Sequence, residues 1–152
     1  MCGIVGIFIK NKKLESNLGN YLSKMINNMS SRGPDSAGFA IYDSLKNKKL
    51  CKFSLCFSDN TNINYFIKDI KKNFKDIKTK ELSDHLVVTT SSKIEIFKKY
   101  ITNKYKDISI VGYGQSIEIF KQVGNPQDIV KKFQLNKFKG THGIGHTRMA
   151  TE

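Results

Sequence analysis

The chain opens with a cysteine directly in front of a short apolar strand. Residues Gly3 to Ile9 are apolar and rich in β-branched side chains, a pattern typical of a buried strand. Gly3 and Gly6 allow the backbone to pass close to another segment or to a ligand. The sequence therefore predicts that Cys2 immediately precedes a strand packed into the core.

Cys2 also follows the initiator methionine, and its side chain is small enough for methionine aminopeptidase to accept. Removal of Met1 would leave a thiol and a free α-amine on the same residue. A peptide α-amine has a pKa of about 8, so near neutral pH part of it can accept a proton. One residue can then supply both nucleophile and base. The alternative interpretation is a small buried cysteine.

Apolar residues at helical spacing predict a helix over residues 14–29, with one apolar stripe that includes its methionines. The segment 30–38 is dense in turn-forming residues and leads into a strand at 39–42. Ser91 or Ser92 is expected to cap a helix. Further strands are predicted at 49–57, 85–90, 108–113 and 116–123, a polar turn at 59–64, and further helices at 65–78, 93–105 and 127–135.

The last stretch, residues 140–152, alternates like a strand but carries histidine, threonine and arginine where a plain strand would carry valine and isoleucine. Its glycines imply close backbone approach. His142 and His146 lack the partners and spacing of a recognised metal site, so a structural or hydrogen-bonded role is favoured for them.

The formal net charge is +13, which is typical of proteins that bind nucleic acid. However, 24 of the 26 basic residues are lysines, which are scattered or paired on the polar sides of expected helices. No arginine-rich or aromatic-interleaved patch occurs. A solvated surface is therefore favoured over a nucleic-acid interface, for which salt-sensitive binding to DNA or RNA would be the test.

The only arginines are Arg32 and Arg148. A chain this rich in lysine is expected to keep arginine where a planar, bidentate grip on a carboxylate or a fixed loop hydrogen bond is needed. Arg32 lies beside Gly33 and Pro34, which favours a functional loop. Arg148 lies at the expected end of a strand, where a guanidinium suits a substrate carboxylate.

At 152 residues the chain has the length of one domain, and its hydrophobic content of 39% is ordinary for a soluble globular protein. No apolar run approaches the ~18 residues of a membrane span, and the N-terminal stretch does not fit a secretory signal. Cys2, Cys51 and Cys56 show no paired metal spacing. This argues against a disulfide scaffold or zinc site, favours a reduced cytoplasmic setting, and leaves Cys51 and Cys56 as structural residues.

Three separated pieces together resemble the class II glutamine amidotransferases, the N-terminal-nucleophile family that releases ammonia from glutamine. They are the start Met1-Cys2-Gly3-Ile4-Val5-Gly6, the loop Arg32-Gly33-Pro34-Asp35-Ser36-Ala37-Gly38, and the strand Gly145-His146-Thr147-Arg148. Residues 120–152 look most like the stand-alone amidotransferase subunit of glutamate-synthase-like enzymes, including N-methylglutamate synthase. The resemblance makes residues 1–152 the N-terminal part of one amidotransferase domain, with a branch-specific insertion at about 46–118.

The resemblance implies an α+β fold of four layers, αββα, with the nucleophile at the start of a central strand. It implies that Cys2 attacks the side-chain amide of L-glutamine to form a γ-glutamyl thioester, and that its α-amine carries the proton. Arg148 would hold the substrate's α-carboxylate with Thr151 nearby, while Arg32, Gly33 and Thr147 would support the site. No cofactor or metal is expected in this chain, although synthase partners of this family carry flavin and iron–sulfur centres.

The family pattern continues to an Asn-Gly pair that supplies the oxyanion hole and to an Asp that binds the substrate's amino group, whereas this sequence stops at Glu152. The expectation is therefore a fold incomplete at its C-terminus. Two hypotheses follow: a glutaminase domain or subunit that passes ammonia to a synthase partner, and a truncated, inactive module with a scaffold or regulatory role. Neither nucleic acid nor membrane is an expected partner.

Overall fold

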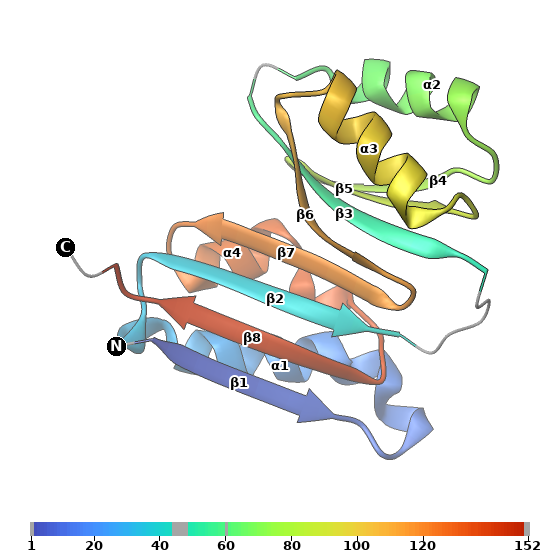
Figure 1. Cartoon of the computed structure of the whole chain (residues 1–152). Helices are drawn as coiled ribbons and strands as arrows, with labels where there is room; N and C mark the ends of the chain where they lie inside the picture. Colours follow the sequence, from blue (N-terminus) through green and yellow to red (C-terminus); the bar gives the residue numbers. More distant parts are fainter. Residues whose placement is uncertain (1, 44–48, 60, 151–152) are drawn as a thin grey trace. The chain divides into compact units, whose positions relative to one another are not determined.

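The structure is a computed structural model that describes residues 2–43, 49–59 and 61–150. Contacts divide the chain into two compact units (Figure 1). Unit 1 combines Met1–Ser44 with Ile119–Glu152, and unit 2 is Leu45–Glu118. The described residues form two antiparallel four-stranded sheets and four α-helices, which confirms the α+β class. The αββα layering and the branch-specific nature of the insertion stay predictions.

The sheet of unit 1 has its strands in the order β1-β8-β2-β7. Both β1 and β2 run antiparallel to β8, which lies between them. A strand forms at the N-terminus as predicted, but it is not the buried strand expected, because Ile4 is 73% and Phe8 67% exposed. Among the described residues β1 pairs only with β8 and is an edge strand, where the resemblance implied a central one. The strands are β1 (Gly3–Phe8), β2 (Ser36–Tyr42), β7 (Ile117–Val123) and β8 (His142–Arg148).

Helix α1 (Leu18–Asn28) packs on this sheet (Figure 1). Its Leu22 and Ile26 side chains are almost fully buried. Glycines in β8 allow this contact. A Cβ on Gly143 would lie 2.9 Å from a Leu22 methyl carbon, and a Cβ on Gly145 would lie 2.5 Å from Ile26 Cγ1. The close approach expected from the glycines of the last stretch is therefore confirmed.

The predicted helix over 14–29 is confirmed only from Leu18 onward. The residues before it form a 3-10 helix, η1 (Lys12–Asn17), in which the Leu14 amide donates to the Asn11 carbonyl at 2.9 Å. The side chain of Asn11 caps this turn by accepting from the Lys13 amide at 3.1 Å. The Asn11 cap therefore favours a 3-10 helix in this segment, and the helical periodicity of the apolar residues could not distinguish it from the α-helix that follows.

An aromatic cluster closes the core of unit 1. Phe39 stacks on Phe120 with ring centroids 5.1 Å apart, and both contact Phe133 and Phe138. Phe133 directly follows helix α4 (Pro126–Lys132), which begins at the proline, one residue before the predicted range 127–135, and ends three residues short of it. A short 3-10 helix, η3 (Leu135–Lys137), then leads to Phe138. Local helix geometry thus delivers two of the four rings to the core.

Unit 2 has strands in the order β4-β5-β3-β6. Its buried cluster joins the strands to helices α2 and α3 through Phe53, Leu55, Phe66 and Phe97. Of the described helices, none is both long and apolar enough to cross a membrane. The elements are β3 (Cys51–Phe57), α2 (Ile63–Asn73), β4 (Lys78–Leu82), β5 (His85–Thr90), α3 (Ile94–Lys104) and β6 (Ile108–Gly114).

Three local expectations in unit 2 were wrong: the polar turn, the end of the helix after it, and the serine cap. Helix α2 starts inside the predicted polar turn, because the Asn62 side chain caps it by accepting from the Tyr65 amide at 2.9 Å. It ends at Asn73, and strand β4, which pairs with β5, was not predicted at all. The N-cap of α3 is Lys93, with no side-chain capping bond, so neither serine caps it.

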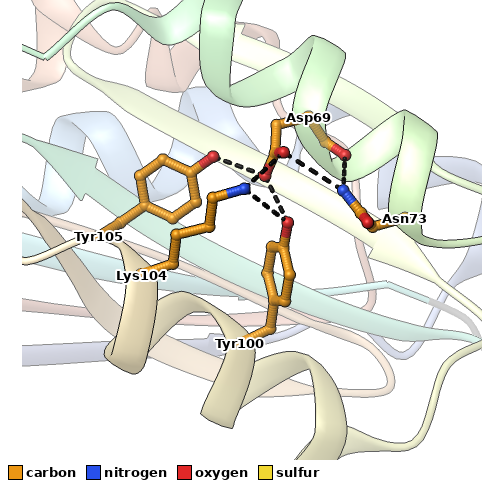
Figure 2. Close-up of polar contacts among 5 residues, drawn as sticks. All are labelled: Asp69, Asn73, Tyr100, Lys104 and Tyr105. Atoms are coloured by element: carbon orange, nitrogen blue, oxygen red, sulfur yellow. Dashed lines mark hydrogen bonds and ion pairs between the residues drawn. The ribbon is translucent and has the colours of Figure 1, made fainter.

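Asp69 on α2 ties that helix to α3 and the residue that follows it (Figure 2). Its carboxylate accepts hydrogen bonds of 2.6 Å from Tyr100, Tyr105 and Lys104. Burial raises the pKa of Asp69, but the hydrogen bonds from Lys104 and the two tyrosines outweigh it and lower this pKa to about 2. The carboxylate therefore stays charged and holds the two helices of unit 2 together.

We expect Asp69→Asn to destabilise the chain by about 1–3 kcal/mol at pH 7, because charge-assisted hydrogen bonds are lost. Asp69 has a lower pKa when folded than the ordinary value of about 3.9, so its stabilisation is present above pH ~4 and is lost as the pH falls toward 2. Urea unfolding of both proteins from pH 7 to pH 2 should show the two stabilities converging. Asp59→Asn, at an exposed position, is the control. An unchanged Asp69→Asn midpoint would contradict the prediction.

Candidate active site

The pairing of β1 with β8 places Cys2 beside the end of β8. Gly3 is the register partner of Thr147, so Cys2 extends from β1 at the level where β8 reaches Arg148. The start of β1 and the end of β8 lie at the same end of the sheet (Figure 1). Cys2 is exposed, as is Arg148. The structure thus brings the expected nucleophile and the expected carboxylate ligand, 146 positions apart in sequence, to one place.

The loop that follows α1 is bound to the same strand end. Pro34 forms a parallel bridge with Arg148, and the Asp35 amide donates to the Arg148 carbonyl at 3.1 Å. Gly33 is buried against this backbone, since a Cβ there would lie 2.6 Å from Arg148 N. Arg32 ends the short 3-10 helix η2 (Ser30–Arg32), and its side chain is exposed. The expected site-supporting loop therefore contacts the segment that carries Arg148.

Thr147 has a structural position. Its side chain is 1% exposed and its hydroxyl donates to the Met29 carbonyl at 3.2 Å, which joins β8 to the end of α1. A Cβ on Gly3 would lie 2.9 Å from this hydroxyl oxygen and 3.3 Å from Met29 Cβ. Only glycine therefore fits beside Cys2 at this contact, and Thr147 lies where it can hold the start of β1.

Asp35 is a connecting residue to which the sequence assigned no role. Its carboxylate accepts from the Ala150 amide at 2.6 Å, and its carbonyl accepts from the Gly124 amide at 2.8 Å. It thereby fixes the chain beyond β8 as well as the end of β7. Its place after Gly33-Pro34 is the sequence signal, because aspartate in such a turn commonly bonds to nearby backbone amides.

Five of the residues singled out from the sequence meet at this end of the sheet, and one cannot be placed. Thr151 lies outside the described residues. The five are Cys2, Arg32, Gly33, Thr147 and Arg148. Their roles in chemistry stay predictions. Chemically, the arrangement places an exposed cysteine and an exposed arginine on neighbouring strand ends, and a guanidinium can orient a substrate carboxylate by paired hydrogen bonds.

His142 lies at the other end of β8 and is engaged in packing. Its ring stacks on Tyr42 with centroids 4.2 Å apart, and its Nδ1 lies 2.9 Å from the Thr141 hydroxyl oxygen. This is the hydrogen-bonded structural role that the sequence favoured. His146 is exposed on β8, two residues before Arg148.

Comparisons with known proteins agree with the resemblance seen in the sequence. The whole chain aligns at 39% identity with the "Glutamine amidotransferase-like protein GlxB" of Rhizobium meliloti (strain 1021), covering 51% of that protein. It aligns at 30% identity with the "Putative glutamine amidotransferase" of Methanothermobacter thermautotrophicus, covering 53% of it. The chain is similar to glutamine amidotransferases. No protein-family model matches it.

The alignment extends over all of this chain but spans only about half the length of these curated relatives. Both relatives have "glutamine amidotransferase" in their names, which supports the resemblance of this chain to that family.

Proposed function

We propose that this chain carries the nucleophile of a class II glutamine amidotransferase, a glutaminase domain or subunit that supplies ammonia to a glutamate-synthase-like partner. The observation that carries the proposal is the meeting of Cys2 with Arg148 and the Gly33 loop at one end of the sheet of unit 1. The names of the two relatives support the same reaction class.

The first half of the reaction forms a thioester. After removal of Met1, the α-amine of Cys2 takes the thiol proton and the sulfur attacks the side-chain amide carbon of glutamine. The carbon–nitrogen bond then breaks, the α-amine returns the proton to the leaving nitrogen, and ammonia departs. The γ-glutamyl group stays on the sulfur of Cys2.

In the second half, the α-amine of Cys2 takes a proton from water as the water attacks the thioester carbon, and returns it to the departing sulfur. Glutamate is released, so the sum is glutamine plus water to glutamate plus ammonia. Arg148 binds the α-carboxylate of the substrate throughout, and Thr151 is proposed to assist it. The Arg32–Gly33 loop and Thr147 keep the end of β8 in place. No redox step occurs in the hydrolysis of glutamine, so this reaction needs no cofactor.

The decisive experiment measures the intact mass of the protein as isolated from cells, after incubation with a diazoketone analogue of glutamine. A protein lacking methionine that gains one adduct, mapped to the N-terminal peptide, supports the proposal. A protein that takes up no adduct at Cys2 while folded would overturn it and favour the inactive-module hypothesis.

We expect Arg148→Lys to raise the KM for glutamine by about 10- to 100-fold with a smaller change in kcat. Lysine keeps the charge but loses the planar two-point contact with the α-carboxylate, which is worth about 1.5–3 kcal/mol for hydrogen bonds to a charged group. Steady-state ammonia release measures both constants. Lys121→Arg, a surface exchange on β7, is the matched control. An equal loss of kcat with unchanged KM would argue against carboxylate binding.

A further inference from the structure

Unit 2 brings three side chains of metal-ligand type together at one end of its sheet. Cys56 lies on β3 and is the register partner of His85, the first residue of β5. Asp84 directly precedes His85 in the turn between β4 and β5. One ligand atom from each of the three residues lies within 4.8 Å of the other two.

This spacing is close to what one bound ion requires. Three points no more than 4.8 Å apart share a centre at most about 4.8/√3, or about 2.8 Å, from each. Zinc–ligand distances are about 2.0–2.3 Å, so shifts of roughly half an ångström per side chain would complete the coordination. The Asp84 Oδ1 and His85 Nδ1 atoms share a hydrogen bond at 3.0 Å, so an ion bound by both would replace the proton between them.

The backbone holds the three residues in this arrangement. The Phe57 amide, next to Cys56, donates to the Asp84 carbonyl at 2.9 Å, which links the end of β3 to the turn. Ser83 before it has a positive φ of 57°, which gives the tight turn that presents Asp84 and His85 together. The candidate ligands are therefore positioned by a sheet ladder and a fixed turn.

We propose that Cys56, Asp84 and His85 bind one divalent ion of borderline softness, with zinc as the best match and water in the fourth position. A thiolate, an imidazole and a carboxylate together select such an ion over magnesium or calcium, which prefer oxygen ligands. The His85 side chain is 1% exposed and that of Asp84 is 27% exposed, so an ion would enter past the carboxylate. A Cys–His–Asp nucleophile is less well supported, because its base would be shielded from a substrate.

The site goes beyond the proposed glutaminase function, since it lies wholly in unit 2 and uses neither Cys2 nor Arg148. The sequence argued against zinc because its cysteines show no paired spacing. Cys56 and the Asp84-His85 pair are 28 positions apart, and only the pairing of β3 with β5 joins them.

The test uses Co²⁺ as a spectroscopic probe and Zn²⁺ in calorimetry, both in a Cys2→Ser background because a free N-terminal cysteine can itself chelate metal. The background protein should bind one ion and show a thiolate-to-cobalt charge-transfer band. Cys56→Ser should abolish the band and weaken zinc binding at least tenfold. Cys51→Ser, which changes the other cysteine of the same strand, should retain both.

Asp84→Asn is the second variant, for the case that Cys56→Ser fails to fold. The Asp84 side chain is partly exposed, so its replacement should not prevent folding. This variant should retain the thiolate band but weaken zinc binding by about tenfold. Absence of a charge-transfer band in the folded background protein, or an unchanged band in folded Cys56→Ser, would overturn the proposal.

Discussion

Replacing Cys2 by alanine should abolish both alkylation by a diazoketone analogue of glutamine and ammonia release from glutamine. The change removes the only sulfur that can form the thioester at this site, while the α-amine remains. Loss of a nucleophile lowers turnover by many powers of ten, and we expect at least about a 10³-fold loss here. Intact-mass analysis and a coupled ammonia assay measure the two effects. The fold should persist, because the side chain of Cys2 is exposed.

The controls for this prediction are the other two cysteines. Cys51→Ser, and Cys56→Ser provided that it folds, each remove a thiol from unit 2 and should label at Cys2 to the full extent. Burial raises the pKa of the Cys51 thiol, which makes its reactive thiolate form less available. If Cys2→Ala protein took up the analogue as well as the unaltered protein, the nucleophile would have to be elsewhere.

Replacing Gly33 by alanine should both destabilise the chain and slow labelling of Cys2. The added Cβ would lie 2.6 Å from Arg148 N and 2.6 Å from Thr147 C, a separation that real Cβ atoms do not show. Both neighbours are backbone atoms, so a side-chain rotation cannot relieve the contact. Overpacking of this kind costs about 1–3 kcal/mol. The strand end would have to move, and it carries Arg148 and pairs with Gly3.

Gly6→Ala is the matched control on the same sheet. The nearest atom to its added Cβ would be the Gly143 carbonyl oxygen at 3.8 Å, an ordinary contact. Urea unfolding should show a change within about 0.5 kcal/mol for Gly6→Ala and a clear loss for Gly33→Ala. Equal stability and equal labelling rates for the two variants would show that the loop does not hold the site.

Residue periodicity was enough to predict the elements that contribute many apolar side chains to the core. β5 was predicted with its observed bounds, and α3 to within one residue at each end, because their apolar residues recur at strand or helix spacing. It failed for β4, whose exposed and charged residues, Lys78 and Lys80 among them, give no such signal. That segment is a strand because it pairs with β5, and a partner strand is not visible in a local window.

The candidate site divides in the same way. Its residue types could be read from the sequence, since Cys2 follows the initiator and the arginines stand out among lysines. The contacts that join these residues could not be read from the sequence. Gly33 packs against the backbone of Arg148, and Asp35 accepts hydrogen bonds from the amides of Gly124 and Ala150, which are 89 and 115 positions away.

The sequence by itself predicted the nature of the nucleophile, and it determined the core stripe of α1 and the need for glycine in β8, because side-chain chemistry and periodicity are local properties. Only the tertiary structure decided that β1 lies beside β8, that the Gly33 loop closes on Arg148, and that Cys56 meets His85. The physical reason is that strand register and backbone approach are set by hydrogen bonds between distant segments, whose partners no single stretch of sequence specifies.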